Sequence, residues 1–476
     1  MRTFDLIIIG TGSANSIPGP EFADWDIAIV EDGKFGGTCT NVGCIPTKMF
    51  VHPADLADAV RLARPLGVDA HVDAVHWPAI RDRIFGRIDA IEAGGRKYRK
   101  GERSPNTSVY EGFGRFVGTK QLEVSLHDGT VETISADKIV IAAGGQPRIP
   151  PIPGLADLPA TVRHTSDTVM RIDDLPSRVL IIGGGYVGAE FAHVFGSFGS
   201  QVTVVARTML LLPHHDTAIA EAYTAHARQR YDVRLDTEVA SVEAGTADGP
   251  GGLTATLTDG GSVEADIVLI ATGREPNGHR LQVERTGVGL DGEGRVVVDR
   301  YQQTAVDGIF ALGDVSSAHQ LKHVANHEAR VVAHNLLHPG AMRAADHRFV
   351  PSAVFTDPQV AAVGLTEEQA IDCGVEYVSY TQRYADIAAG WAREDTTHFL
   401  KVLADPVTGM LIGAHVIGPE AATVIQPVIQ SMSFGLSAHE TARSQYWIHP
   451  ALSELVENAL LGLPEPTGEP PGRAHG

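Results

Sequence analysis

The feature of this sequence that most constrains its fold is a pattern that occurs twice. Residues 4–31 and residues 179–207 each predict a strand, a glycine-rich turn, a short helix and a second strand, which together open a dinucleotide-binding βαβ unit. A second matching signal follows each copy, at residues 137–147 and 266–276, where an apolar run ends in small residues and a proline. The pattern therefore predicts an internal duplication of a nucleotide-binding half-domain.

The length of 476 residues predicts about three domains, at roughly 150 residues per domain. We expect an α/β protein with two Rossmann-like nucleotide-binding domains and a C-terminal α+β interface domain, in which two strands and amphipathic helices occupy residues 398–461. The predicted ranges are 1–150 with 274–345, 151–273 and 346–463, followed by a Pro- and Gly-rich tail, residues 464–476, expected to be disordered.

The charge balance limits the partners. The chain has 38 Lys and Arg against 58 Asp and Glu, a formal net charge of −20, which disfavours nucleic-acid and anionic-membrane surfaces. A polyphosphate ligand would therefore need local basic residues or helix ends. Because no secretory signal pattern and no apolar run of about 20 residues occurs, we expect a cytoplasmic protein without membrane contacts.

The first glycine motif is incomplete. Gly10 and Gly12 occupy the first two positions of G-x-G-x-x-G, but Asn15 replaces the third glycine, which normally permits close packing of a helix on the strand. Glu31 closes the next strand 21 residues after Gly10, where a carboxylate can accept hydrogen bonds from a ribose. The alternative is an ordinary glycine-rich turn and a surface glutamate.

The second glycine motif is complete. Gly183, Gly185 and Gly188 follow an apolar strand, and the helix that they open can hold a pyrophosphate at its N-terminal amides. The next strand ends in Arg207, where sites that prefer NADH usually have an acidic residue. A guanidinium suits a 2′-phosphate, so NADPH is favoured. The alternative is a solvated arginine at a strand end.

Two cysteines are the most informative residues. Cys39 and Cys44 are five positions apart, about 7.5 Å along an ideal helix, which is too far for a disulfide, so an oxidised pair needs a distorted turn that Gly43 permits. In a reducing compartment such a pair is redox-active or metal-binding rather than structural. Zinc is disfavoured because Cys373, the only other cysteine, has no ligand-like companions. We therefore predict no metal site, and Cys373 is interpreted as a packed or surface thiol.

Both nucleotide motifs, the C-x4-C run, residues 304–314, and His449-Pro450 followed by Glu454 together resemble the pyridine nucleotide disulfide oxidoreductases, the family of glutathione reductase and lipoamide dehydrogenase. The resemblance extends from Asp5 to about Leu463. It implies an FAD-dependent enzyme that takes electrons from NADPH, with FAD bound by residues 1–150 and 274–345 and NADPH by residues 151–273.

The resemblance also implies roles for six catalytic residues. Cys44 would lie against the flavin as the charge-transfer thiolate, and Cys39 would attack the substrate disulfide. Lys48 would approach the flavin and pair with Glu190. His449, oriented by Glu454, would be the acid/base that protonates the leaving thiolate, and it would reach the cysteines of the other subunit, so that a homodimer shares each active site.

The cofactor residues implied by these motifs form two groups. For FAD they are Gly10, Gly12, Glu31, Gly37, Thr38, Lys48, Gly144 and Asp314. For NADPH they are Gly183, Gly185, Tyr186, Gly188, Glu190, Arg207 and Gly273. Tyr186 matches the residue that gates the nicotinamide pocket in some members. One departure is Pro213, which stands where members specific for NADPH often have a second arginine.

The substrate is expected to be a small disulfide. Residues 16–22 contain no arginine pair of the kind that binds the carboxylates of glutathione in glutathione reductases, so glutathione disulfide is disfavoured. Arg207 argues against lipoamide dehydrogenases, which prefer NADH. No cysteine pair follows Glu454, which disfavours the large thioredoxin reductases and mercuric reductases.

Four longer stretches resemble the actinobacterial branch of the family that reduces mycothiol disulfide, whose substrate is hydroxyl-rich and lacks the charged ends of glutathione. They are residues 10–16, 165–170, 323–330 and 444–450. We therefore expect reduction of mycothiol disulfide. The alternatives are a dihydrolipoamide dehydrogenase, a reductase of another disulfide such as glutathione disulfide, or a flavoprotein scaffold without enzymatic activity, which six intact catalytic residues disfavour.

Overall fold

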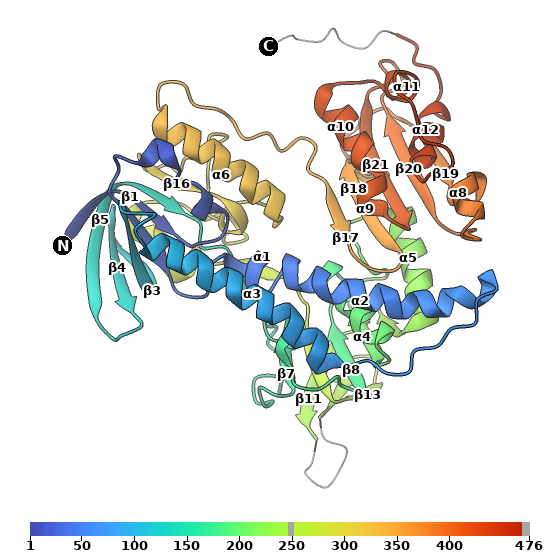
Figure 1. Ribbon diagram of the computed structural model, residues 1–476, viewed down its shortest axis with the longest axis horizontal. Coiled ribbons are helices and arrows are strands. Elements are labelled where there is room, and N and C mark those ends of the chain that lie inside the picture. Colours follow the sequence, from blue (N-terminus) through green and yellow to red (C-terminus); the bar gives the residue numbers. More distant parts are fainter. Residues whose placement is uncertain (246–251, 469–476) are drawn as a thin grey trace.

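The computed structural model describes residues 1–245 and 252–468. Three main sheets form in it (Figure 1). The strands of the first lie within residues 1–150 and 274–345, those of the second within 151–273, and those of the third within 346–463. This mixed α/β architecture is the one expected from the sequence; the exact domain boundaries remain predictions.

The first sheet has a parallel part with the strand order β3-β2-β1-β5-β16, and β4 pairs antiparallel with both β3 and β5. Side chains alternate across it: Leu6 and Ile8 pack in one cluster with α6, while Ile7 and Ile9 pack on the opposite face. The bounds are β1 (Arg2–Ile9), β2 (Ile27–Glu31), β3 (Thr107–Gly118), β4 (Gln121–Leu126), β5 (Val131–Ile141), β16 (Ile309–Ala311) and α6 (Lys322–Leu337).

The second sheet is wholly parallel, with the order β10-β9-β8-β14-β7. An antiparallel meander, β11-β12-β13, packs on one face and α4 on the other. The bounds are β7 (Arg163–Thr165), β8 (Arg178–Ile182), α4 (Tyr186–Ser197), β9 (Gln201–Ala206), α5 (Thr217–Arg230), β10 (Asp232–Leu235), β11 (Val239–Ala244), β12 (Leu253–Leu257), β13 (Ser262–Ala265) and β14 (Ile267–Ile270).

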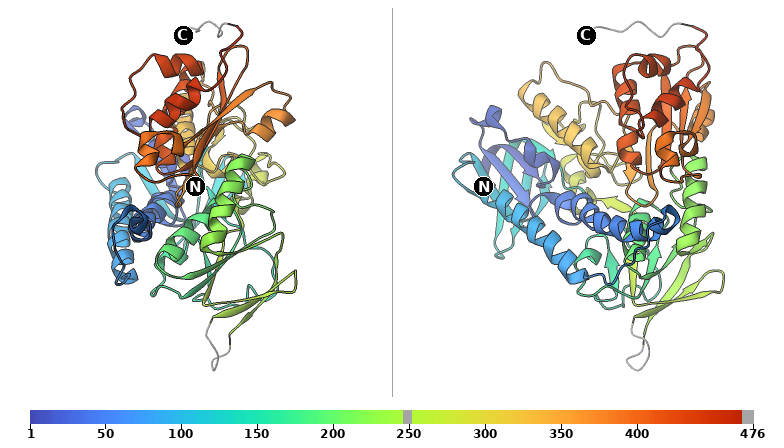
Figure 2. Two further views of the ribbon diagram at one scale, coloured as in Figure 1. Left: turned by 90° about the vertical axis from the view of Figure 1, so that its right-hand side faces the viewer. Right: turned by 45° about the vertical axis from the view of Figure 1, so that its right-hand side comes forward.

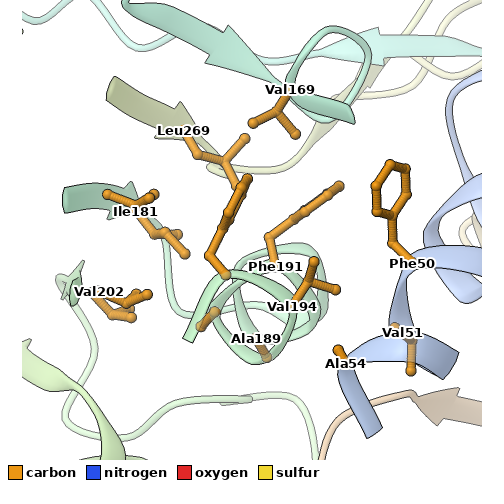
Figure 3. Close-up of a cluster of buried hydrophobic side chains, with 14 of the residues drawn as sticks. Phe50, Val51, Ala54, Val169, Ile181, Ala189, Phe191, Val194, Val202 and Leu269 are labelled. Carbon is orange, nitrogen blue, oxygen red and sulfur yellow. The ribbon is translucent and has the colours of Figure 1, made fainter. Parts of the chain in front are cut away.

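Two long helices, α2 (Cys44–Ala63) and α3 (Trp77–Lys100), lie between β2 and β3 in the sequence and extend in space from the first sheet toward the second (Figure 1). Phe50 of α2 stacks on Trp77 at 4.9 Å between ring centroids, and Trp77 stacks on Phe195 of α4 at 5.8 Å. Figure 3 shows Phe191 and Val194 of α4 in the same buried cluster. This apolar contact fixes α2, which begins at Cys44, against the helix that follows the second glycine motif.

The duplication is confirmed in three dimensions. In both copies the strand before the glycine motif lies between the strand after it and the strand of the second signal, as β2-β1-β5 and β9-β8-β14. Gly10 and Gly183 have φ of +104° and +125°, and a Cβ on either would lie 2.4 Å from Ala142 O or 2.2 Å from Ala271 O. Only glycine fits at these crossings. The strands β6 (Gly145–Pro147) and β15 (Arg274–Pro276), which end the second signals, pair with each other.

The copies differ after the glycine motif. In the second copy α4 is the predicted helix, but in the first copy the prediction is wrong: residues 10–26 contain no α-helix, only 3-10 turns at Ser13–Ser16 and Pro20–Phe22. Pro18, Gly19 and Pro20 interrupt any helix there. The segment is held instead by the buried Arg99, whose Nε donates to Asn15 Oδ1 at 2.8 Å and whose Nη1 donates to Pro18 O at 3.2 Å.

The third sheet is antiparallel, with the order β17-β18-β21-β20-β19, and helices cover it (Figure 2). The two strands expected near residues 398–418 are confirmed. The helix expected at 421–434 is divided into two, at 421–424 and 426–434, and the one expected at 451–461 begins at Glu454. The bounds are β17 (Ser352–Val354), β18 (Gln359–Gly364), α7 (Glu367–Asp372), β19 (Val378–Arg383), α8 (Ala388–Trp391), β20 (Phe399–Ala404), β21 (Leu411–Gly418), α9 (Ala421–Val424), α10 (Gln426–Phe434), α11 (Ala438–Arg443) and α12 (Glu454–Leu461).

The predicted tail is described only in part. Backbone amides of Thr467 and Gly468 donate to the carbonyls of Pro406 and Val407, whereas residues 469–476 lie outside the described residues. Within the described chain, no helix combines the length and the apolar character that a bilayer crossing requires.

A buried ion pair joins the second and third sheets. Lys401 Nζ of β20 donates to both carboxylate oxygens of Asp216 at 2.9 Å, and it also pairs with Glu367 at 2.6 Å. Asp216 is fully buried. It caps α5 through Ala218 N, so one carboxylate ties a helix of the nucleotide-binding half to the C-terminal sheet.

We predict that Lys401→Met lowers the free energy of unfolding by about 3–5 kcal/mol, because it leaves the buried Asp216 without its cation. Denaturant unfolding followed by circular dichroism measures this. The control is Lys100→Met, which removes the half-exposed Lys100–Glu111 pair and should cost at most about 1 kcal/mol. Equal losses in the two variants would contradict the importance of the buried pair.

Candidate active site

The two cysteines meet at a break between helices. Cys39 lies in α1 (Gly37–Asn41), Cys44 begins α2, and the chain leaves helical geometry at Val42 and Gly43 between them. A Cβ on Gly43 would lie 3.0 Å from Thr38 O and 3.3 Å from Cys39 Cα. The distorted turn expected at Gly43 is therefore present, and it folds the backbone of α1 back onto the start of α2.

Both cysteines are free thiols here, and they are not equivalent. A hydrogen bond from Cys39 and the charge of Lys48 lower the pKa of Cys44 to about 7, against the opposing effect of burial. The hydrogen bond to Cys44 and burial raise the pKa of Cys39. Near neutral pH the pair therefore carries its negative charge on Cys44 and its proton on Cys39.

The Lys48 side chain is fixed by two residues that lie beside the second and third sheets. Its Nζ donates to both oxygens of Glu190 of α4, at 2.6 and 2.7 Å. Glu190 is buried and also accepts the backbone N–H of Phe355 at 3.0 Å. The ring of Phe355 lies 4.7 Å from Lys48 Nζ, a cation–π contact. Three parts of the chain thus converge on one cation beside Cys44.

A single cavity of ≈1860 Å³ connects the cysteines to both glycine motifs. The predicted site residues that line it are Gly10, Gly12, Glu31, Gly37, Thr38, Cys39, Cys44, Lys48, Gly144, Gly183, Gly185, Tyr186, Glu190, Arg207, Gly273 and Asp314. Gly188 is not among the lining residues: a Cβ on it would lie 2.4 Å from Gly183 O, so its role is to let α4 pack closely on the turn. His449 and Glu454 also lie outside the cavity.

The glycine motifs leave room for phosphates. A Cβ on Gly12 or on Gly185 would meet nothing within 4 Å, so the backbone at both positions borders open cavity, as pyrophosphate binding requires. Glu31 is held at the first motif by Thr11, whose N–H and hydroxyl donate to its Oε2 at 2.8 and 2.5 Å. The residues present therefore fit two dinucleotides, one at each motif.

Two other cavity residues are perturbed by burial. The surrounding protein raises the pKa of Tyr186 to about 12, although 45% of the residue is open to the cavity. Burial also raises the pKa of Asp314, against the charge of Arg274. Both side chains therefore favour their neutral forms more than they would in water, which makes the Tyr186 hydroxyl a hydrogen-bond donor at neutral pH.

His449 and Glu454 form a dyad on the surface of the third domain. His449 Nδ1 donates to Glu454 Oε1 at 2.6 Å, and the other carboxylate oxygen accepts Ala451 N–H at 3.1 Å. The hydrogen bond from His449 lowers the pKa of Glu454. The imidazole side chain is 71% exposed, and α12 lies well apart from α1 in Figure 1. Within one chain the dyad and the cysteines are therefore not brought together.

Some residues of the site have no signal in the sequence. Phe355 lies just after β17 and contacts Lys48 and Glu190 only because the third sheet packs on α4. Lys322, in the first turn of α6, also lines the cavity. Its only signal in the sequence is its position eight residues after the run 304–314.

Comparison with known proteins agrees with this geometry. A family model described as pyridine nucleotide-disulphide oxidoreductase matches residues 4–329, and a model of the dimerisation domain of that family matches residues 350–460. Mycothione reductase of Mycobacterium tuberculosis (strain ATCC 25618 / H37Rv) is 50% identical over 470 residues, which are 97% of this chain and 100% of that protein.

Solved structures are similar along nearly the whole chain. The Cu(II) complex of the HOCl-induced flavoprotein disulfide reductase RclA from Escherichia coli superposes with a TM-score of 0.85 at 29% identity, covering 97% of this chain and 99% of that one. LpdA from Mycobacterium tuberculosis superposes with a TM-score of 0.83 at 26% identity, with the same coverage.

The pKa of Cys44 gives a prediction for the reduced protein. Alkylation of Cys44 by iodoacetamide should speed up as the pH rises, with a midpoint near 7, because only the thiolate reacts. Lys48→Met should move that midpoint upward, since it removes the cation that favours the thiolate. Fragment-level mass spectrometry follows Cys44, and the exposed Cys373 in the same sample is the control. An unchanged midpoint in the variant would contradict the role of Lys48.

Proposed function

The chain belongs to the pyridine nucleotide-disulphide oxidoreductase family, and from this we propose that it uses NADPH and FAD to reduce mycothiol disulfide through Cys39 and Cys44. The observation that carries the reaction type is the cysteine pair beside Lys48 in a cavity shared by both glycine motifs. The observation that carries the substrate is the 50% identity with a mycothione reductase over 97% of the chain.

We assign the two cofactors to the two motifs. FAD would be held at Gly10, Gly12 and Glu31, and NADPH at Gly183, Gly185 and Arg207, with the other residues named for each group around them. Bound FAD would supply a two-electron relay between the nicotinamide and the disulfide. Arg207 supports NADPH because no carboxylate in the described chain pairs with it, so its guanidinium is available to a 2′-phosphate.

The thiol chemistry follows from the unequal pKa values. Cys39 attacks one sulfur of the substrate disulfide while its proton passes to the imidazole of His449, so that a Cys39–substrate disulfide forms and one thiolate leaves, which takes up that proton. Cys44, already the thiolate, then attacks Cys39, which releases the second half of the substrate as a thiolate that water protonates, and forms the Cys39–Cys44 disulfide. Two electrons have then passed to the substrate, and two from NADPH restore the dithiol.

His449 protonates the first leaving thiolate in this proposal. Its hydrogen bond to Glu454 through Nδ1 fixes the orientation of the imidazole. Since the dyad lies outside the cavity of its own chain, we propose that it serves the cysteines of a second copy, in a homodimer formed through the dimerisation domain. We also propose a cytoplasmic location, as expected from the sequence.

The substrate proposal is tested with purified protein, a reductant and a panel of disulfides. With NADPH as the reductant, we expect kcat/KM for mycothiol disulfide to be at least about a hundredfold higher than kcat/KM for glutathione disulfide. Arg207→Met should raise KM for NADPH about tenfold or more and leave KM for NADH nearly unchanged. Oxidation of dihydrolipoamide with NAD⁺, without turnover of mycothiol disulfide, would replace the proposal with a lipoamide dehydrogenase.

Mixed dimers test the shared active site. Cys39→Ser should abolish turnover and His449→Ala should lower it about 10²–10⁴-fold. Coexpressed, the two chains form mixed dimers with one intact site, which should restore about a quarter of wild-type activity. The control mixes Cys39→Ser with Cys44→Ser, where no intact site can form. Failure of the first mixture to recover activity, with dimers present, would place His449 in the site of its own chain.

A further inference from the structure

The first glycine motif lacks the feature that normally neutralises a pyrophosphate. A helix of several turns places free amides and the positive end of its macrodipole at the phosphates. The second motif has such a helix, the 12 residues of α4, whereas the first is followed only by a 3-10 turn of 4 residues. In a chain with a net charge of −20, a dianionic pyrophosphate at Gly12 needs another source of positive charge.

Lys322 is such a source. Its Nζ donates to Ser13 Oγ at 2.8 Å, and Ser13, directly after Gly12 in the motif, donates to Asn326 Oδ1 at 2.9 Å. Lys322 and Asn326 are four residues apart on α6, so one face of that helix meets the glycine motif. An ammonium has three donors, and the structure gives Lys322 one acceptor, which leaves two for phosphate oxygens.

Among the described residues no carboxylate forms an ion pair with Lys322, whose charge acts on Asp314 only from a distance, where it opposes the effect of burial on the pKa of Asp314. Most cations that line the cavity pair with a carboxylate; among the described residues the lysines and arginines that do not are Arg148, Arg207 and Lys322. Lys322 also lies in the first turn of α6, which has no acidic residue and no side-chain cap. A cation at that end of a helix is unfavourable, so this arrangement is explained by an anion that binds there.

We propose that Lys322 binds the pyrophosphate of FAD and replaces the helix that the first glycine motif has lost. This inference rests on the proposed function, because it takes FAD as the ligand of that motif. It assigns α6, more than 300 positions later in the chain, to the phosphate site of β1 and β2. The duplicated motifs then hold their pyrophosphates differently: the second by the N-terminus of α4 and the first by Lys322.

The test measures FAD affinity of the apoprotein by quenching of flavin fluorescence. Lys322→Met should raise Kd for FAD about 10- to 100-fold, the value of one or two charged hydrogen bonds, and Lys322→Arg should keep most of the affinity. The control is Lys97→Met, an exposed lysine of α3 that carries the same change of charge. Added KCl should weaken FAD binding more in the wild type than in Lys322→Met.

Two outcomes overturn the inference. One is an equal Kd for the wild type and Lys322→Met. The other is a shifted midpoint potential of the bound flavin in Lys322→Met, which would place the ammonium on the flavin ring. If Lys322→Met does not fold, the wild-type apoprotein is acetylated on its lysines with and without FAD. Bound FAD should slow the acetylation of Lys322 and not that of Lys97. Equal acetylation of Lys322 in both samples would count against the site. A wild-type apoprotein that binds no FAD refutes the proposed cofactor instead.

Discussion

The ion pair between Lys48 and Glu190 is the interaction on which the rest of the site depends. Its two residues belong to α2 and α4, which follow the first and second glycine motifs, and the backbone of Phe355 adds the third domain. The pair is short and the carboxylate is buried, so removing either partner would leave an uncompensated charge inside the protein. The same contact therefore aligns three domains and places a cation beside Cys44.

The asymmetry of the two thiols follows from that placement. Cys39 and Cys44 belong to a continuous run of sequence, and a regular helix would have kept them apart. The break at Gly43 brings them together, and Lys48, one turn into α2, favours the thiolate of the nearer cysteine. Backbone geometry thus supplies the hydrogen bond, and the domain junction supplies the charge that makes one thiol ionise first.

Much of this architecture could be predicted from local sequence. The glycine motifs, the duplicated strands and the C-terminal hairpin are short-range patterns, and each occurs as expected. The helix expected after Gly12 does not form, because Pro18, Gly19 and Pro20 outweigh the motif. Phe355 could not be found in advance, since its contacts join segments far apart in sequence and depend on packing between domains.

The long sequence separations at Glu190 have a consequence for the synthesis of the protein. Its hydrogen-bond partners lie 142 residues before it and 165 residues after it, so a ribosome completes the cysteine segment long before the third domain emerges. Until α4 emerges Lys48 has no carboxylate to hold it beside Cys44, and until residue 355 emerges Glu190 lacks its backbone donor. An unfinished chain thus carries the thiol pair without its fixed cation, and the full set of contacts around Cys44 arises only when the whole molecule has folded.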